Sequence, residues 1–155
     1  MKDFHYTPLL EKSGEGEVGF TIGSAINASL SKVWENVCKG ENLKKYFNTD
    51  TKGDLDSVGQ VIWIWGEQGV VINVLEVIPF EKIVFEWNGN NVEYTVRTEF
   101  HFELIKKETI IKIKEKGWLN DTKGLKSAFA NCSGWTEYLN ALKVHIEYNI
   151  NFLKE

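Results

Sequence analysis

Arginine is almost absent from this chain: Arg97 is the only arginine among the 18 Lys and Arg residues. Proteins that recognise phosphate through two parallel hydrogen bonds depend heavily on arginine. The formal net charge of −4 also leaves no basic excess with which to cover a polyanion. We therefore expect no nucleic-acid partner.

Cysteine and histidine are also scarce, with two and three residues respectively. Cys38 and Cys132 fit neither a metal-ligand spacing nor a CxxC motif, which favours two reduced thiols in a cytoplasmic protein. No two histidines are four residues apart, and the HExxH, GxSxG, GxGxxG and P-loop motifs are all missing. These absences predict no metal site, no cofactor and no catalytic motif for nucleotide or acyl chemistry.

Long apolar runs are missing as well. No stretch approaches the length of a membrane span, and the opening MKDFHYTPLL lacks the apolar centre of a signal peptide. We expect a cytoplasmic protein without a membrane span.

Aromatic residues, in contrast, are abundant: the 155 residues include six Trp, nine Phe and five Tyr. Each aromatic side chain buries a large area, so this content predicts a broad core. The length suits a single domain over residues 1–155. Residues 1–16 end in the charged, Gly-interrupted EKSGEGE, which predicts a loose N-terminal arm.

The remaining pattern predicts a mainly antiparallel sheet and few helices. A strand over 18–26 precedes two short helices over 27–37 and 41–47, the first with Ser29 as its N-cap. Short turns then separate five segments of strand character, so neighbouring strands pair antiparallel. These segments are 60–65, 70–78, 82–87, 93–104 and 109–116.

The chain turns helical from GWLNDTKGLKSAFANC (117–132), and the stretch that follows, SGWTEYLNALKVHIEYNINFL (133–153), predicts one long amphipathic helix. Its apolar stripe consists of Trp135, Leu139, Leu142, Ile146, Ile150 and Leu153. About 19 helical residues span roughly 28 Å, enough to cross a whole sheet. The fold class is therefore α+β, with a curved sheet around one long C-terminal helix. This helix either fills the core or closes one side of a cavity.

Four segments resemble one known family in their order and spacing. They are INASLSKVWENV, VLEVIPFEKIVFEW, TIIKIKEKGW and SGWTEYLNALKVHIE, with Val33-Trp34, Pro79, Trp87 and Gly134-Trp135 as the recurring residues. Across residues 18–150 the chain resembles the family named after the activator of Hsp90 ATPase. That family has the helix-grip fold of START-like and Bet v 1-like proteins. The resemblance implies a cavity that binds an apolar small molecule, and it implies a chaperone partner only weakly.

The candidate lining of such a cavity combines the inward register of the strands with the stripe of the helix. We predict it to contain Trp63, Trp65, Phe85, Trp87, Tyr94, Thr98, Phe100, Ile113, Glu115, Trp135, Tyr138, Leu139, Leu142, His145 and Ile146. The same residues could equally fill a packed core. Glu115 shares the inward register of Ile113 but stands near a strand end, which favours exposure at the rim over burial.

Three functions fit these residues. The first is non-catalytic binding of an apolar or aromatic molecule between the sheet and the terminal helix. The second is a cyclase, aromatase or dehydratase, for which Glu115, Tyr138 and His145 are the candidate acid–base groups. The third is a protein-interaction module or homodimer, which requires an exposed apolar patch on the outer sheet face or near Trp63 and Trp65.

Overall fold

The computed structural model describes residues 8–14, 16–89 and 92–154. Four helices are present in these residues: α1 (Leu30–Cys38), α2 (Gly40–Tyr46), α3 (Thr122–Tyr148) and the 3₁₀ turn η1 (Phe152–Lys154). The strands are β1 (Leu9–Gly14), β2 (Glu17–Ile26), β3 (Asp50–Lys52), β4 (Gly59–Trp65), β5 (Gln68–Ile78), β6 (Lys82–Trp87), β7 (Val96–Ile105) and β8 (Glu108–Leu119).

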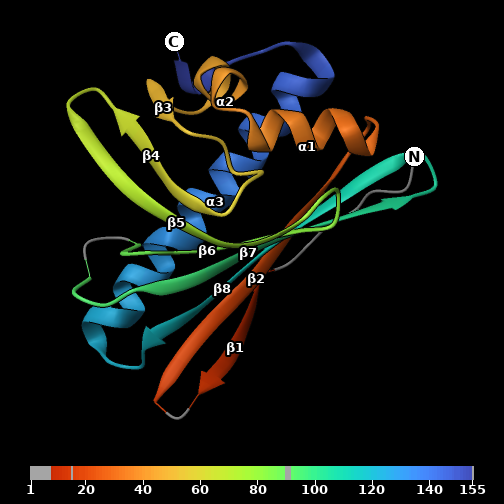
Figure 1. The fold of residues 1–155 in the computed structure, drawn as a ribbon. Coiled ribbons are helices and arrows are strands. Elements are labelled where there is room, and N and C mark those ends of the chain that lie inside the picture. The colour runs from red at the N-terminus through yellow and green to blue at the C-terminus, as the bar shows by residue number, and fades with distance from the viewer. Residues whose placement is uncertain (1–7, 15, 90–91, 155) are drawn as a thin grey trace.

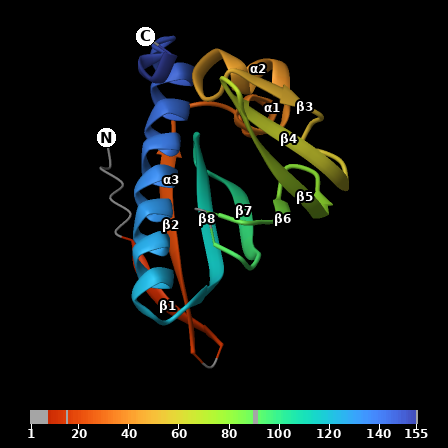
Figure 2. The same cartoon turned by 90° about the vertical axis from the view of Figure 1, so that its left-hand side faces the viewer.

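The strands form one antiparallel sheet in the order β1-β2-β8-β7-β6-β5-β4-β3. Helix α3 packs along β2 and β8, and the sheet curves away from it toward β5, β4 and β3 (Figures 1 and 2). Helices α1 and α2 lie beside the C-terminal end of α3 (Figure 2). The predicted α+β helix-grip architecture is confirmed.

Helix α3 begins at Thr122, so the helical segment expected over 117–132 and the long terminal helix form one continuous helix. The side chain of Asp121 caps it by accepting a hydrogen bond from the Gly124 amide at 2.7 Å. Its 27 residues span about 40 Å. The helix ends at Tyr148, because Asn149 takes a left-handed conformation with φ of 55°.

This early end removes two residues from the predicted helical stripe. Ile150 follows the helix and is 50% exposed, while Leu153 lies half-buried in η1. The turn that carries them folds back on α2. The two residues therefore belong to a short cover over the end of the helix rather than to its apolar face.

The prediction of a loose arm over residues 1–16 is wrong for the part of this segment that forms β1. Leu9–Gly14 pairs with β2 as the edge strand of the sheet. Charged residues and glycine are uncommon in strands, so the composition of this segment did not indicate one. Residues 1–7 and 15 of the expected arm lie outside the described residues.

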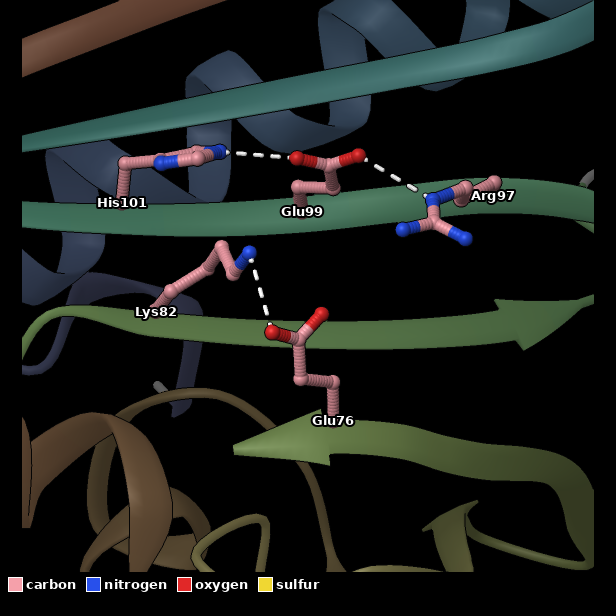
Figure 3. A network of polar contacts seen from close by, with 5 residues as sticks. All are labelled: Glu76, Lys82, Arg97, Glu99 and His101. Carbon is pink, nitrogen blue, oxygen red and sulfur yellow. Dashed lines mark hydrogen bonds and ion pairs between the residues drawn. The ribbon is translucent and has the colours of Figure 1, made fainter. Parts of the chain in front are cut away.

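The outer face of the sheet carries a polar network in the predicted outward register of β7 (Figure 3). Glu99 lies between Arg97, whose Nε donates to it at 3.1 Å, and His101, whose Nε2 is 2.9 Å away. On the neighbouring strands Lys82 and Glu76 form an ion pair of 3.1 Å. Burial raises the pKa of the Glu99 carboxyl, but the hydrogen bonds from His101 and Arg97 outweigh it and lower the pKa overall.

We expect Glu99→Gln to lower the free energy of unfolding at pH 7 by less than about 1 kcal/mol, since the network is open to solvent. A lowered pKa stabilises the fold above the unfolded-state pKa of about 4.3, so the difference from wild type should shrink below that pH and disappear once the lowered folded-state pKa is passed. Urea unfolding at pH 7 and pH 3, with and without 1 M NaCl, measures this. A difference that persists at pH 3 would contradict the assignment.

Candidate functional site

A pocket of about 380 Å³ opens between α3 and the strands β4 and β6. It lies where the sheet has curved away from the helix, and Phe47 at the end of α2 and Leu153 of η1 also line it. Its lining consists of Phe47, Trp63, Trp65, Trp87, Asn131, Gly134, Trp135, Glu137 and Leu153. Aromatic rings therefore dominate its wall.

Three of these rings stand in mutually perpendicular planes. The interplanar angles are 89° between Phe47 and Trp63, 88° between Phe47 and Trp65, and 88° between Trp63 and Trp65. The ring centroids are 5.1–6.3 Å apart, in the range of edge-to-face contacts. The strand alternation of β4 places both of its tryptophans on this side of the sheet.

Glu115 lies buried behind the wall, where only 1% of its surface is exposed. Its Oε2 accepts hydrogen bonds from Thr98 Oγ1 at 2.6 Å, Trp135 Nε1 at 2.9 Å and Trp87 Nε1 at 3.2 Å. Its Oε1 accepts one from Asn131 Nδ2 at 2.6 Å. Three of the four donor residues also line the pocket.

The favoured rim position of Glu115 is therefore wrong. Strand β8 runs on to Leu119 instead of stopping at residue 116, so Glu115 is interior to the strand and faces Thr98 of β7. The first turns of α3 then place Asn131 over it. Burial raises the pKa of the Glu115 carboxyl above its ordinary value of 4.5, although its four hydrogen bonds act in the opposite direction.

Of the predicted lining residues, four line the pocket: Trp63, Trp65, Trp87 and Trp135. Six others pack in the core between sheet and helix: Phe85, Phe100, Ile113, Leu139, Leu142 and Ile146. Thr98 is fully buried and bonds to Glu115. Tyr94 lies against Trp118 and accepts a hydrogen bond from the Leu119 amide at 3.1 Å, away from the pocket.

Tyr138 and His145 belong to a second cluster, around Tyr46. The Tyr46 hydroxyl donates to the Asn36 carbonyl at 2.8 Å and lies 3.2 Å from the Tyr138 hydroxyl. His145 stacks on Tyr46 with centroids 4.9 Å apart, and its Nδ1 is 2.6 Å from Asn151 Oδ1. Burial raises the pKa of both tyrosines. Neither Tyr138 nor His145 lines the pocket.

Five lining residues were missed: Phe47, Asn131, Gly134, Glu137 and Leu153. Asn131 is four residues before Trp135, so both lie on one helical face. The helical character of 117–132, together with the stripe position of Trp135, was the signal that could have placed Asn131 in the lining. Phe47 and Leu153 come from the ends of separate elements, and no periodic pattern places such residues.

The described residues contain neither a cluster of metal ligands nor a helix suited to crossing a membrane. None of their His, Cys, Asp and Glu side chains form a group of three or more that could hold a metal ion. Within the same part of the chain, no helix has both the length and the apolar character to cross a membrane. Cys38 and Cys132 are both free thiols.

Solved structures confirm the fold at low sequence identity. Protein SSP2350 from Staphylococcus saprophyticus aligns with a TM-score of 0.73 and 18% identity, over 86% of this chain and 94% of that one. The Aha1 dimer from Colwellia psychrerythraea aligns with a TM-score of 0.70 and 22% identity, over 84% of this chain and 96% of that one. DynU16, a putative protein in the dynemicin biosynthetic locus, aligns with 0.72 and 16%, over 84% of this chain and 48% of that one.

No curated protein matches this sequence. A protein-family match covers most of the chain, from residue 27 to residue 147, and includes α1, the strands β3–β8 and nearly all of α3. The matched range contains all four segments whose order pointed to the helix-grip fold, except the first residue of the first one. The chain belongs to the family described as Activator of Hsp90 ATPase homolog 1-like protein.

Proposed function

We propose that this chain binds a small aromatic or apolar molecule in the pocket between α3, β4 and β6, without catalysing a reaction on it. The observation that carries the proposal is the pocket itself: about 380 Å³ walled by five aromatic rings. Ligand sites are typically concave, largely apolar and a few hundred Å³ in volume. Buried side chains, among them Phe85, Phe100 and Leu139, pack beside this pocket in the core between sheet and helix.

Gly134 gives independent support. It stands in the middle of α3, where glycine costs about 1 kcal/mol relative to alanine. A Cβ atom built at this position would meet nothing within 4 Å, so packing does not require glycine there. Gly134 lines the pocket, and the missing side chain widens it.

The arrangement of the candidate acid–base groups favours binding over catalysis. Glu115 is occupied by four hydrogen bonds behind the wall, whereas Tyr138 and His145 meet at Tyr46. An enzyme of the cyclase or dehydratase type needs its acid and base to reach one substrate. An interaction patch at Trp63 and Trp65 is not present either, since Trp63 is 1% exposed and Trp65 is half-buried.

A panel of flavonoid-like, polycyclic and fatty compounds, screened by ¹⁵N–¹H NMR, tests the proposal. We expect shifts of the indole N–H signals of Trp63, Trp65, Trp87 and Trp135, with Trp34 and Trp118 as internal references outside the pocket. Gly134→Leu should abolish these shifts by filling the space. Gly134→Ala should retain them and stabilise the helix by about 0.5–1 kcal/mol. The absence of pocket shifts with every class would overturn the proposal.

A further inference from the structure

The lining of the pocket has an unusual charge balance. Glu137 is its one charged residue, and no Lys, Arg or His belongs to the described lining. The second carboxyl group, that of Glu115, lies directly behind Trp87 and Trp135. We propose that the ligand of this pocket is an organic cation, an amine or quaternary ammonium attached to an apolar group. This inference rests on the binding function proposed above.

The rings supply the main attraction for such a ligand. The faces of Trp, Tyr and Phe rings carry negative potential and attract ammonium groups, with Trp the strongest of the three. Four of the five lining rings are tryptophans. Phe47, Trp63 and Trp65 stand in three perpendicular planes around one corner, an arrangement in which several rings can surround one compact cation.

Most of the hydrogen-bond donors of the wall are already used inside the protein. Trp65 Nε1 donates to the Phe47 carbonyl at 3.3 Å, and Trp87, Trp135 and Asn131 donate to Glu115. Among the described residues, the buried Nε1 of Trp63 is the one lining donor without a partner. An anionic ligand would therefore find the Nε1–H of Trp63 and the second N–H of the Asn131 amide, and it would face two carboxyl groups.

The acceptors, in contrast, remain available. The exposed carboxylate of Glu137 takes part in no hydrogen bond or ion pair with the described residues, and the Asn131 Oδ1 accepts none from them. Lys154 follows the lining residue Leu153, but its ammonium group donates to the Asn48 carbonyl at 2.7 Å. The polar groups that a ligand meets at the pocket are thus mainly acceptors, which suit an ammonium N–H or a fixed positive charge.

Three probes of one shape test this inference: phenyltrimethylammonium, neutral tert-butylbenzene and anionic benzenesulfonate. Each carries a phenyl ring on a tetrahedral group, so charge is the main difference. We expect the cation to bind about five- to thirtyfold more tightly than the neutral probe, as judged by the pocket indole N–H signals. Benzenesulfonate should leave these signals unchanged.

Two variants separate local charge from general electrostatics. Glu137→Gln should weaken binding of the cation about two- to fivefold without affecting tert-butylbenzene. Glu103→Gln makes the same change in net charge on an exposed residue of β7 and should leave both probes unchanged. Trp65→Leu replaces a half-buried ring. It should weaken binding of the cation more than binding of the neutral probe, because leucine keeps apolar contact but has no ring face.

Equal or tighter binding of tert-butylbenzene would overturn the cation inference and leave the proposed binding function intact. The same holds if none of the three probes shifts the pocket signals while compounds of the larger panel do. If no compound of that panel shifts the pocket signals either, both the proposed binding function and the cation inference are overturned.

Discussion

Replacing Glu115 with leucine is expected to lower the free energy of unfolding by about 2–4 kcal/mol. The carboxyl group is 1% exposed and accepts hydrogen bonds from Thr98, Trp87, Trp135 and Asn131. Leucine has a similar volume but leaves the indole of Trp135 and the hydroxyl of Thr98 without an acceptor. Each buried donor that loses its partner costs about 1–3 kcal/mol. Urea unfolding followed by Trp fluorescence measures the difference.

The matched control is Glu103→Leu, which removes an exposed carboxylate from β7 and should change the stability by less than about 0.5 kcal/mol. Glu115→Gln should fall between the two, because its amide keeps one acceptor oxygen and presents an NH₂ group to the surrounding donors. A Glu115→Leu variant as stable as wild type would show that the buried network contributes no net stability.

The pH dependence of Glu115 should be opposite to that of Glu99. Its pKa is raised in the folded protein, so the unfolded chain ionises first as the pH increases. The carboxyl group makes its full contribution to the free energy of unfolding below the unfolded-state pKa of about 4.3. This contribution declines as the pH rises and is lost once the pH passes the raised folded-state pKa. The stability advantage of wild type over Glu115→Gln should therefore shrink between pH 4 and pH 7. A growing advantage would mean that the pKa is lowered instead.

The same carboxyl group illustrates how far the sequence could be interpreted. Alternation along β8 correctly assigned Ile111, Ile113 and Glu115 to one face of the sheet. Whether the end of that face was covered depended on α3 and its first turns, which lie 16 residues away at Asn131. Period-two patterns determine the side of a sheet, but they carry no information on what packs against it.

The pocket was only partly predictable for a related reason. The four tryptophans belong to regular elements, so their inward direction follows from strand and helix periodicity. The pocket is present because the sheet curves away from α3 toward β4, and this curvature separates lining residues from those that fill the core. Phe85 and Phe100 share the inward register of Trp87 and Thr98, yet they lie where helix and sheet are in contact.

Truncation of Trp135 is the second large effect that we expect. Its ring is 4% exposed and lies 5.4 Å from Phe100, 5.5 Å from Tyr138 and 5.6 Å from Trp87 between ring centroids. Trp135→Ala would remove this central ring and should cost about 3–5 kcal/mol. Trp65→Ala, at the half-buried edge of the same cluster, should cost clearly less and serves as the comparison.

The stability of Trp135→Ala alone would not separate the contribution of ring packing from that of the hydrogen bond to Glu115. A double-mutant cycle separates the two contributions. Trp135→Phe keeps a ring but loses the Nε1 donor, so in wild type it should cost about 1–2 kcal/mol. In the Glu115→Leu background the indole N–H has already lost its acceptor, and the same change should cost much less. We expect a coupling energy of about 1 kcal/mol between the two sites. Additive losses would show that Trp135 stabilises the fold by packing alone and that Glu115 does not hold the pocket wall through it.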